Sequence, residues 1–268
     1  MRPKPEQFGA SYAETFKDQR VVDAYKYRPP YPTEVFEILA GLIIDKPRIV
    51  LDVGAGSGGI ARQLVGVVDR VDAVDFSQPM IEMGKQLPNG NHPHLQWIYG
   101  KVEEVPLTPP YALIAAGMSI HWTEWSIVFP RFRSLLTPNG SLALIYRWTL
   151  PAPWDAEIKK LRDQFSTYQN PRVANAVEEV KSRGFFQQLG EKETNPIPFF
   201  QSVDDFVAGL HSWIAFSWGR MGQQKAAEFD NQVKSLLTQF QSDGMLSLQV
   251  AATVMWGRPE DGSMQQKQ

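Results

Sequence analysis

Short apolar runs alternate through the middle of the chain with longer segments in which apolar residues recur every three or four positions. The apolar runs predict five strands, at residues 48–53 (RIVLDV), 71–75, 94–99, 111–117 and 141–147. Strands separated by helices of this length favour a parallel sheet with right-handed crossovers. Ligands of such sheets bind outside the carboxyl ends of the strands, so we expect the functional residues there.

Helix signals fill the gaps between these strands. Apolar residues recur at helical spacing over residues 60–67, and Ser77 with Pro79 supplies the N-cap and first-turn residues that begin another helix. The helix after the fourth strand is expected to end near Pro138–Asn139–Gly140, a strong stop signal. This pattern predicts an α/β fold with a doubly wound, mostly parallel sheet.

Two regions fall outside the alternation and flank the predicted core. We expect one domain over residues 1–268, in which these flanking regions cover the carboxyl edge of the sheet. Its expected parts are an N-terminal helical cap (1–45), a cofactor-binding core (46–148), an aromatic-rich insertion after the fifth strand (149–222), a last helix and strand (223–256, with the helix at about 223–240) and a polar tail (257–268).

The composition of the chain says little about its fold but limits the classes of function that it can have. The chain has 268 residues, 43% apolar and 21% charged, with a net charge of −2, which gives no reason to expect a nucleic-acid or membrane surface. It has no cysteine, so disulfides, thiolate nucleophiles and cysteine metal sites are excluded. The N-terminal residues lack a signal-peptide pattern, and no run reaches the about 20 apolar residues of a membrane span, so we expect a cytoplasmic protein.

The strongest chemical signal is the stretch IVLDVGAGSGGIARQL at residues 49–64. Gly54, Gly56 and Gly59 satisfy the dinucleotide fingerprint, which predicts NAD or FAD. Asp52, at the mouth of the same turn, repels a pyrophosphate but attracts an ammonium group, while the N–H groups of the loop take a carboxylate. An amino acid joined to a nucleoside has this layout.

Asp75 ends the second predicted strand, 17 positions after Gly58. This spacing is close to the roughly 20 residues that separate a glycine-rich loop from the acid that binds the ribose hydroxyls in dinucleotide-binding folds. Its position favours a nucleoside ligand without separating NAD from other cofactors. Structural alternatives stay open at this point, because the glycines can simply shape a tight turn and Asp75 can cap the helix that follows.

The chain resembles class I S-adenosylmethionine-dependent methyltransferases in four ordered segments, VLDVGAGSGGIARQL, VDAVDFSQPMIEMGK, YGKVEEVPL and ALIAAGMSIHW. The His121–Trp122 pair and YKYRPPYP at residues 25–32 are similar to the small-molecule branch that includes trans-aconitate methyltransferase-like proteins. The resemblance covers residues 25–148 well. It implies S-adenosylmethionine as the cofactor, a Rossmann-like sheet of seven strands and a small-molecule acceptor.

The resemblance also implies roles for individual residues. The methionine part of the cofactor would be held by Asp52, Gly54, Ala55 and Gly56. The ribose and adenine would be bound or bordered by Asp75, Phe76, Met80, Lys101, Val102 and Glu103, and Met118 would line the floor. The family often has an acid where this chain has Lys101. The adenine contact therefore falls to the Val102 backbone or to Glu103. Tyr25 and Arg28 of the cap are expected to contact the cofactor as a lid, or alternatively only to fix the chain against the sheet.

His121 follows the fourth strand, where an acceptor would meet the cofactor. It can take a proton or orient an acceptor carboxylate, with Trp122 lining the substrate pocket. The structural alternative is that His121 caps a helix or satisfies a buried carbonyl, and that Trp122 belongs to the core. Methyl transfer from a sulfonium needs no metal, and we expect none, because His92 and His94 lie in a polar loop without an acidic partner.

The segment from Trp148 to Trp218 is rich in aromatic residues, which favours a pocket for an apolar or aromatic acceptor. Arg147 and Arg220 are candidates to pair with an acceptor carboxylate. The leading hypothesis is a small-molecule methyltransferase. The alternatives are a cofactor-binding protein without transferase activity and, disfavoured by Asp52, a nicotinamide-dependent oxidoreductase. The sequence is silent on the oligomeric state.

Overall fold

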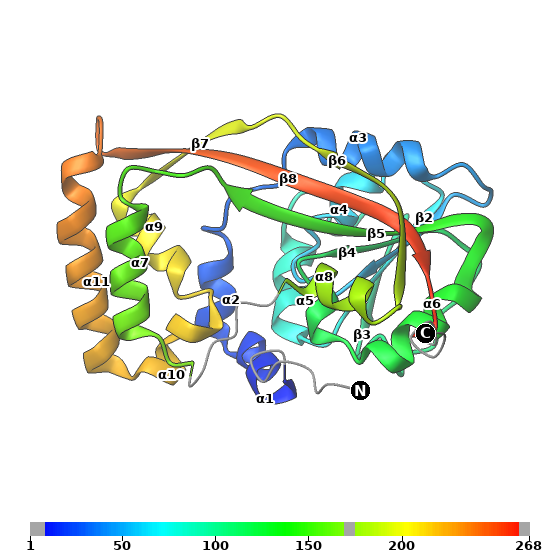
Figure 1. The fold of residues 1–268 in the computed structure, drawn as a ribbon, viewed down its shortest axis with the longest axis horizontal. Helices are drawn as coiled ribbons and strands as arrows, with labels where there is room; N and C mark the ends of the chain where they lie inside the picture. Colours follow the sequence, from blue (N-terminus) through cyan, green and yellow to red (C-terminus); the bar gives the residue numbers. More distant parts are fainter. Residues whose placement is uncertain (1–8, 169–174, 263–268) are drawn as a thin grey trace. The chain divides into compact units, whose positions relative to one another are not determined.

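A computed structural model describes residues 9–168 and 175–262 of the chain (Figure 1). The chain divides into two compact units, each built from three separate segments. The sheet unit comprises Tyr31–Arg147, Val173–Asn195 and Ala252–Gln268. The helical unit comprises Met1–Pro30, Trp148–Arg172 and Pro196–Ala251. The expectation of one continuous domain with a cap at 1–45 stays a prediction beside this division.

The sheet follows the order β3-β2-β1-β4-β5-β8-β6, and β7 pairs with β8 beside this path. Its strands are β1 (Ile49–Val53), β2 (Arg70–Asp75), β3 (Leu95–Tyr99), β4 (Tyr111–Gly117), β5 (Leu136–Thr149), β6 (Phe186–Glu193), β7 (Ile197–Ser202) and β8 (Met245–Pro259). The β1–β2, β1–β4, β2–β3 and β4–β5 pairs are parallel, whereas β6 and β7 run antiparallel to β8. The predicted Rossmann-like, mostly parallel sheet is confirmed, with one strand more than the expected seven.

The strand order reverses between β1 and β4. β1 pairs with β2 on one side and β4 on the other, and these central strands are almost fully buried. Such a reversal leaves a crevice at the carboxyl ends of the two strands, where ligands of open α/β sheets bind. The fold therefore directs attention to the residues after β1, β2 and β4.

The helices of the sheet unit are α3 (Thr33–Leu42), α4 (Ala61–Leu64), α5 (Gln78–Gln86), the 3-10 turn η3 (Ile120–Trp122), α6 (Trp125–Leu135) and α8 (Ala176–Ser182). Ser77 caps α5 by accepting the N–H of Met80, with Pro79 in the first turn, as the sequence predicts. The helix expected over 60–67 is shorter, because α4 ends at Leu64 and Val67 is 51% exposed.

The helix after β4 ends before its predicted stop signal, and that signal lies in a strand. α6 ends at Leu135, and Pro138–Asn139–Gly140 lie inside β5 rather than in a stop turn. Asn139 is held in place by Asp45, whose carboxylate accepts both its backbone N–H at 2.8 Å and its side-chain amide at 3.0 Å. These long-range bonds stabilise extended backbone where the local residues favour a turn.

The helical unit contains α1 (Ala10–Ala13), η2 (Glu14–Lys17), α2 (Gln19–Tyr25), α7 (Asp155–Phe165), α9 (Val203–Leu210), η4 (Ile214–Phe216), α10 (Trp218–Met221), α11 (Gln223–Leu237) and η5 (Thr238–Phe240), with β7 and the first part of β8. The helix predicted at about 223–240 is confirmed as α11 continued by η5. Many of the aromatic residues expected to line an acceptor pocket form the core of this unit, among them Trp154, Phe165 and Phe216.

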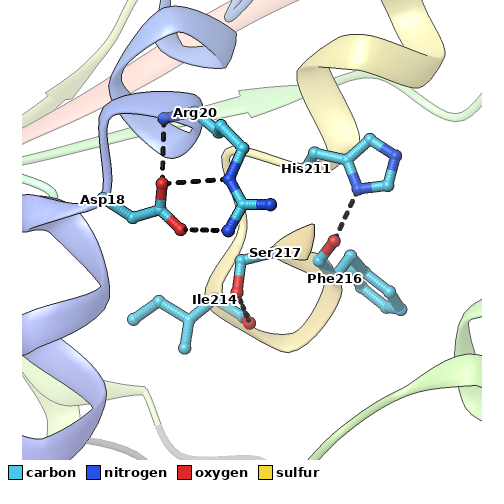
Figure 2. A network of polar contacts seen from close by, with 6 residues as sticks. All are labelled: Asp18, Arg20, His211, Ile214, Phe216 and Ser217. Atoms are coloured by element: carbon cyan, nitrogen blue, oxygen red, sulfur yellow. Dashed lines mark hydrogen bonds and ion pairs between the residues drawn. The ribbon is translucent and has the colours of Figure 1, made fainter. Parts of the chain in front are cut away.

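Polar contacts fix the turns between the helices of this unit (Figure 2). Asp18 caps α2 by accepting the N–H of Arg20 at 3.0 Å, and its other oxygen pairs with the Arg20 guanidinium at 2.9 Å. The fully buried His211 ring places Nδ1 2.6 Å from the carbonyl of Phe216 and Nε2 2.7 Å from Asp230. The segment after α9 is thereby held on α11.

The chain's last strand is longer than expected, because β8 continues through Pro259 and includes residues assigned to the polar tail. Residues 263–268 of that tail lie outside the described part of the chain. Within residues 9–168 and 175–262, no helix has the length and apolar character needed to cross a bilayer.

Candidate functional site

The loop after β1 is shaped by glycines in left-handed conformations. Gly54, Gly56 and Gly58 have φ of 63°, 57° and 77°, values at which other residues are strained. A Cβ on Gly54 would lie 2.6 Å from the Cβ of Ser119, so the loop packs directly on the segment after β4. A Cβ on Gly56 would have no described atom within 4 Å. The loop is thus a tight turn, and at Gly56 a ligand can approach the backbone.

Several amide groups of this loop already have protein partners. The N–H of Gly56 donates to Asp75 Oδ2 at 2.7 Å, and that of Ala61 donates to Asp52 Oδ2 at 3.0 Å. The N–H groups of Ala55 and Gly58 donate to backbone carbonyls at 3.0 and 2.8 Å. These four groups donate to acceptors within the protein, and the expectation that loop amides receive a ligand carboxylate stays a prediction.

Asp52 and Asp75 are buried at the ends of β1 and β2, with 2% and 6% exposure. Burial raises the pKa of Asp52 to about 7 against the lowering effect of the Ala61 N–H, and the charge of Asp75 raises it further. Burial also raises the pKa of Asp75 to about 6, although the N–H groups of Ser77 and Gly56 oppose this. Ser77 rather than Asp75 caps α5, so the capping alternative is wrong. Two buried carboxylates favour a positively charged ligand group nearby.

The residues expected around the adenine differ in exposure. Phe76 is half-buried after β2, whereas Met80 is 2% exposed and packed into the sheet unit. Lys101 is exposed and Val102 is buried. Glu103 accepts the N–H of Glu124 through Oε1 at 2.7 Å, so part of its carboxylate supports the start of α6. The roles of all five residues toward a cofactor stay predictions.

The carboxyl end of β4 continues into a short fixed turn. Met118 has a φ of 55°, and its N–H donates to the Ile145 carbonyl at 3.0 Å. Ser119 donates through Oγ to the Val53 carbonyl, which joins this turn to β1. His121 and Trp122 follow in η3, half-buried, with ring centroids 4.6 Å apart. His121 thus follows the carboxyl end of β4 along the chain by four residues, and its role toward an acceptor stays a prediction.

Two predicted cofactor contacts, Tyr25 and Arg28, belong to the helical unit. Arg28 donates through Nε to Ser212 Oγ and through Nη2 to the Ser212 carbonyl, both at 2.7 Å. Its Nη1 donates to the Tyr25 hydroxyl at 2.9 Å. These bonds join α2 to the segment after α9. A cofactor contact for Tyr25 and Arg28 stays a prediction.

Another tyrosine of the same stretch lies on the sheet unit's glycine loop. An ideal Cβ on Gly59 would lie 3.6 Å from the Tyr31 ring, and one on Gly117 would lie 2.7 Å from its hydroxyl. The Arg147 guanidinium lies over the ring, 4.9 Å from its centroid. Sequence reasoning missed Tyr31, since YKYRPPYP gives no sign of which ring reaches the sheet.

The described residues hold no cluster of three or more His, Cys, Asp or Glu side chains suited to a metal ion. His92 and His94 lie near each other, with ring centroids 5.0 Å apart, before β3. His94 Nδ1 is 3.3 Å from the Val65 carbonyl. The polar groups at the glycine loop are carboxylates and backbone groups, and carboxylates suit an organic cation.

Comparison with known proteins agrees with this geometry. Residues 50–140 match the methyltransferase domain family. Malonyl-acyl-carrier-protein O-methyltransferase of Halalkalibacterium halodurans is 33% identical over 105 residues, covering 37% of this chain and 38% of that protein. A candidate methyltransferase of Dictyostelium discoideum is 22% identical over 226 residues, covering 80% of this chain and 81% of that protein.

Among solved structures, a candidate type II methyltransferase from Anaeromyxobacter dehalogenans superposes with a TM-score of 0.65 at 21% identity. The match covers 87% of this chain and 99% of that chain, and it shows a shared fold. The chain spans little more than a third of the length of the Halalkalibacterium protein that it matches.

Proposed function

We propose that this chain, whose residues 50–140 form a methyltransferase domain of the class I, S-adenosylmethionine-dependent type, transfers a methyl group from S-adenosylmethionine to a small-molecule acceptor. The observation that carries the proposal is the convergence of Asp52, Asp75 and the open face at Gly56 at the strand-order reversal. When bound, the cofactor supplies a methyl group activated by a sulfonium cation. The protein then has to orient the acceptor and exclude water.

The buried acids fit the charge of this cofactor. Ionised Asp52 and Asp75 lie at the ends of adjacent strands, so a ligand with an ammonium and a sulfonium group offsets the cost of burying their charges. A pyrophosphate would add negative charge at the same place, which disfavours a nicotinamide cofactor. Gly56 leaves the backbone accessible to the ligand on the face where a side chain would otherwise stand.

His121 and Trp122 are the proposed acceptor-facing residues. Both are half-buried in the turn that follows β4. In this role His121 accepts a proton from the acceptor or donates a hydrogen bond to its carboxylate, and Trp122 packs against its apolar part. The acceptor is apolar, aromatic or carboxylate-bearing, as in the branch with trans-aconitate methyltransferase-like proteins. The relative named for O-methylation of a malonyl group, which bears a carboxylate, supports this class.

Calorimetry on the full chain tests the cofactor. We expect S-adenosylmethionine and S-adenosylhomocysteine to bind and NAD not to bind. NAD binding without S-adenosylmethionine binding would contradict the proposal.

A second experiment tests the reaction. The chain is incubated with a metabolite extract and S-adenosylmethionine labelled in its methyl group, and labelled small molecules are expected. Tight cofactor binding with no labelled product from any extract would instead favour a binding protein without transferase activity.

A further inference from the structure

We propose that Arg162 and Trp213 form a site in the helical unit that binds the carboxylate of the methyl acceptor, an acid whose carboxylate is carried by an aromatic or other apolar group. This inference rests on the proposed function and deepens it, because it names residues that hold the acceptor's charged group. Both residues fall in the segment 149–222, where the sequence predicts an acceptor pocket, and both belong to the helical unit.

Arg162 is a half-buried cation in α7. Its Nε is buried and has no hydrogen-bond partner among the described residues. Burial lowers the pKa of the guanidinium, and the charges of Asp163 and Asp155 oppose this. Both carboxylates have other partners, because Asp163 pairs with Lys159 at 2.5 Å and Asp155 accepts the N–H of Ala152 at 2.8 Å. A charged group that leaves water without a partner is costly, so this guanidinium favours an anionic ligand.

Trp213 supplies an apolar surface beside this cation. The Arg162 guanidinium lies over the Trp213 ring, with Cζ 4.5 Å from a ring centroid. Even so, Trp213 is 39% exposed, although tryptophan is highly buried on average. A guanidinium that stacks on an aromatic ring is weakly hydrated, and its planar fork matches the two oxygens of a carboxylate. The exposed part of the indole can pack against the apolar part of the same ligand.

The turn that carries Trp213 is fixed by contacts on either side of it. His211 precedes this residue, and its Nδ1 lies 2.6 Å from the carbonyl of Phe216, which follows it (Figure 2). The segment after α7 is bonded to the same turn, because Thr167 donates its N–H and its hydroxyl to the Ala215 carbonyl at 3.2 and 2.9 Å. These bonds hold α7 and the turn together, so little order has to be gained when a ligand binds.

Two other arginines of the helical unit differ from Arg162 in their partners. Arg20 is exposed and pairs with Asp18 at 2.9 Å. Arg220 also stacks on a ring, but it is exposed and donates through Nε to Thr167 Oγ1 at 3.3 Å. Sequence reasoning named Arg220 for the acceptor carboxylate and missed Arg162, because the position of an arginine along the chain does not reveal whether its guanidinium is buried.

The test measures methyl transfer by the full chain to a dilute metabolite extract, with S-adenosylmethionine labelled in its methyl group. One portion of the extract is first treated with a carbodiimide and methylamine, which convert carboxylates to neutral amides. This treatment should lower the initial rate of labelling by the unmodified chain about tenfold or more, the loss typical of a hydrogen-bonded ion pair. Arg162→Met should cause a similar loss on the untreated extract.

Further variants separate the fork from the charge and from the ring. Arg162→Lys keeps the charge but not the planar fork, so its loss should be smaller than that of Arg162→Met. Trp213→Leu should also lower the rate. Arg20→Met removes an exposed arginine of the same unit and is the charge-matched control, which should change the rate by less than about twofold.

Stability and cofactor affinity distinguish ligand binding from a structural role of Arg162. A buried donor without a partner costs stability, and methionine can replace the apolar stem of arginine. Arg162→Met should therefore unfold at the same or a higher urea concentration than the unmodified chain. Its affinity for S-adenosylhomocysteine, measured by calorimetry, should stay within about twofold.

The outcomes separate this inference from its premise. If the unmodified chain labels nothing in any extract, the proposed function fails. If it labels the amidated and the untreated extract equally, or if Arg162→Met labels the untreated extract at the unmodified rate, the inference is overturned. Loss of both stability and S-adenosylhomocysteine affinity in Arg162→Met would also overturn it, since that result indicates a structural role.

Discussion

Asp75 accepts the Gly56 N–H at 2.7 Å, so the end of β2 holds the loop that follows β1. The other oxygen of the same carboxylate accepts the N–H of Ser77, also at 2.7 Å, at the start of α5. One side chain therefore fixes two segments that we propose to contact the cofactor. The conformation of the loop is thus held by bonds within the protein.

Asp75→Ala should destabilise the sheet unit and abolish cofactor binding. Two amide groups lose their acceptor, and each buried, unpaired amide costs about 1–3 kcal/mol, so we expect a loss of about 2 kcal/mol or more. Urea unfolding and calorimetry with S-adenosylhomocysteine measure the two effects. Asp69→Ala is the matched control, because Asp69 accepts the exposed N–H of Arg48 at 2.8 Å, where water can replace it. Equal stability losses in the two variants would contradict this account.

Alanine substitutions at Gly54 and Gly56 should separate packing from ligand access. Both impose a left-handed conformation on alanine, at a cost of about 1–2 kcal/mol. Gly54→Ala also brings a methyl group to 2.6 Å from Ser119, so it should unfold at clearly lower urea concentration than Gly56→Ala. Gly56→Ala should fold but lose cofactor affinity, because its methyl group points into the open space. The reverse order of stabilities would argue against the packing on Ser119.

The buried acids predict opposite pH dependences for stability and for cofactor binding. The pKa of Asp52 is about 7 in the folded chain, against about 3.9 when unfolded. Between these values the folded state keeps a proton that the unfolded state loses. Stability should therefore fall as the pH rises from about 4 to 7 and level off above that. Asp75, with a folded pKa of about 6, acts in the same direction up to that pH.

Affinity for S-adenosylmethionine should instead rise with pH up to about 7, as Asp52 ionises and attracts the cationic ligand. Chemical unfolding across this range and calorimetry at its two ends measure the effects. Asp52→Asn should make both the stability and the affinity for S-adenosylmethionine depend less on pH. Asp69→Asn should leave both pH dependences unchanged. A stability that rises over the same pH range would contradict the assignment.

His121→Ala should separate turnover from cofactor binding. If His121 takes a proton or orients the acceptor, kcat/KM for a labelled acceptor should fall by a factor of about 100. Affinity for S-adenosylhomocysteine should stay within about twofold, because no cofactor contact is assigned to this ring. His94→Ala, an exposed histidine before β3, is the control. Loss of cofactor affinity together with turnover would indicate that His121 supports the fold after β4.

The sequence predicts the sheet well, because burial imposes continuous apolar runs on its strands. The runs at 71–75, 94–99 and 111–117 match β2, β3 and β4 to within a residue. The Ser77 cap was also readable, because capping depends on residues three positions apart. What failed depends on partners far away in the chain. Asp45 holds Asn139 in a strand that local signals assign to a turn.

In the candidate site, too, local sequence predicts some features, whereas others depend on residues far away in the chain. The motif order indicates where a cofactor binds, and the structure places Asp52, Asp75 and the glycine loop together at the predicted edge. Local pattern does not reveal that the N–H groups of Ala55 and Gly56 are paired, because their acceptors, on Val74 and Asp75, lie on β2. Nor does it distinguish Arg28, bonded to Ser212, from Tyr31, three residues later, which lies on the glycine loop.

The strand β8 has a consequence for how the chain is made. Its first residues, from Met245 to Val250, pair with β7, and its later residues, from Thr253 to Pro259, pair with β6. Both β6 and β7 are synthesised before β8, so the edges that pair with β8 stay unpaired in the nascent chain until this last strand has emerged from the ribosome. Neither unit is complete until then, so a nascent chain stopped just before Met245 should be a preferred substrate for chaperones that bind exposed strands.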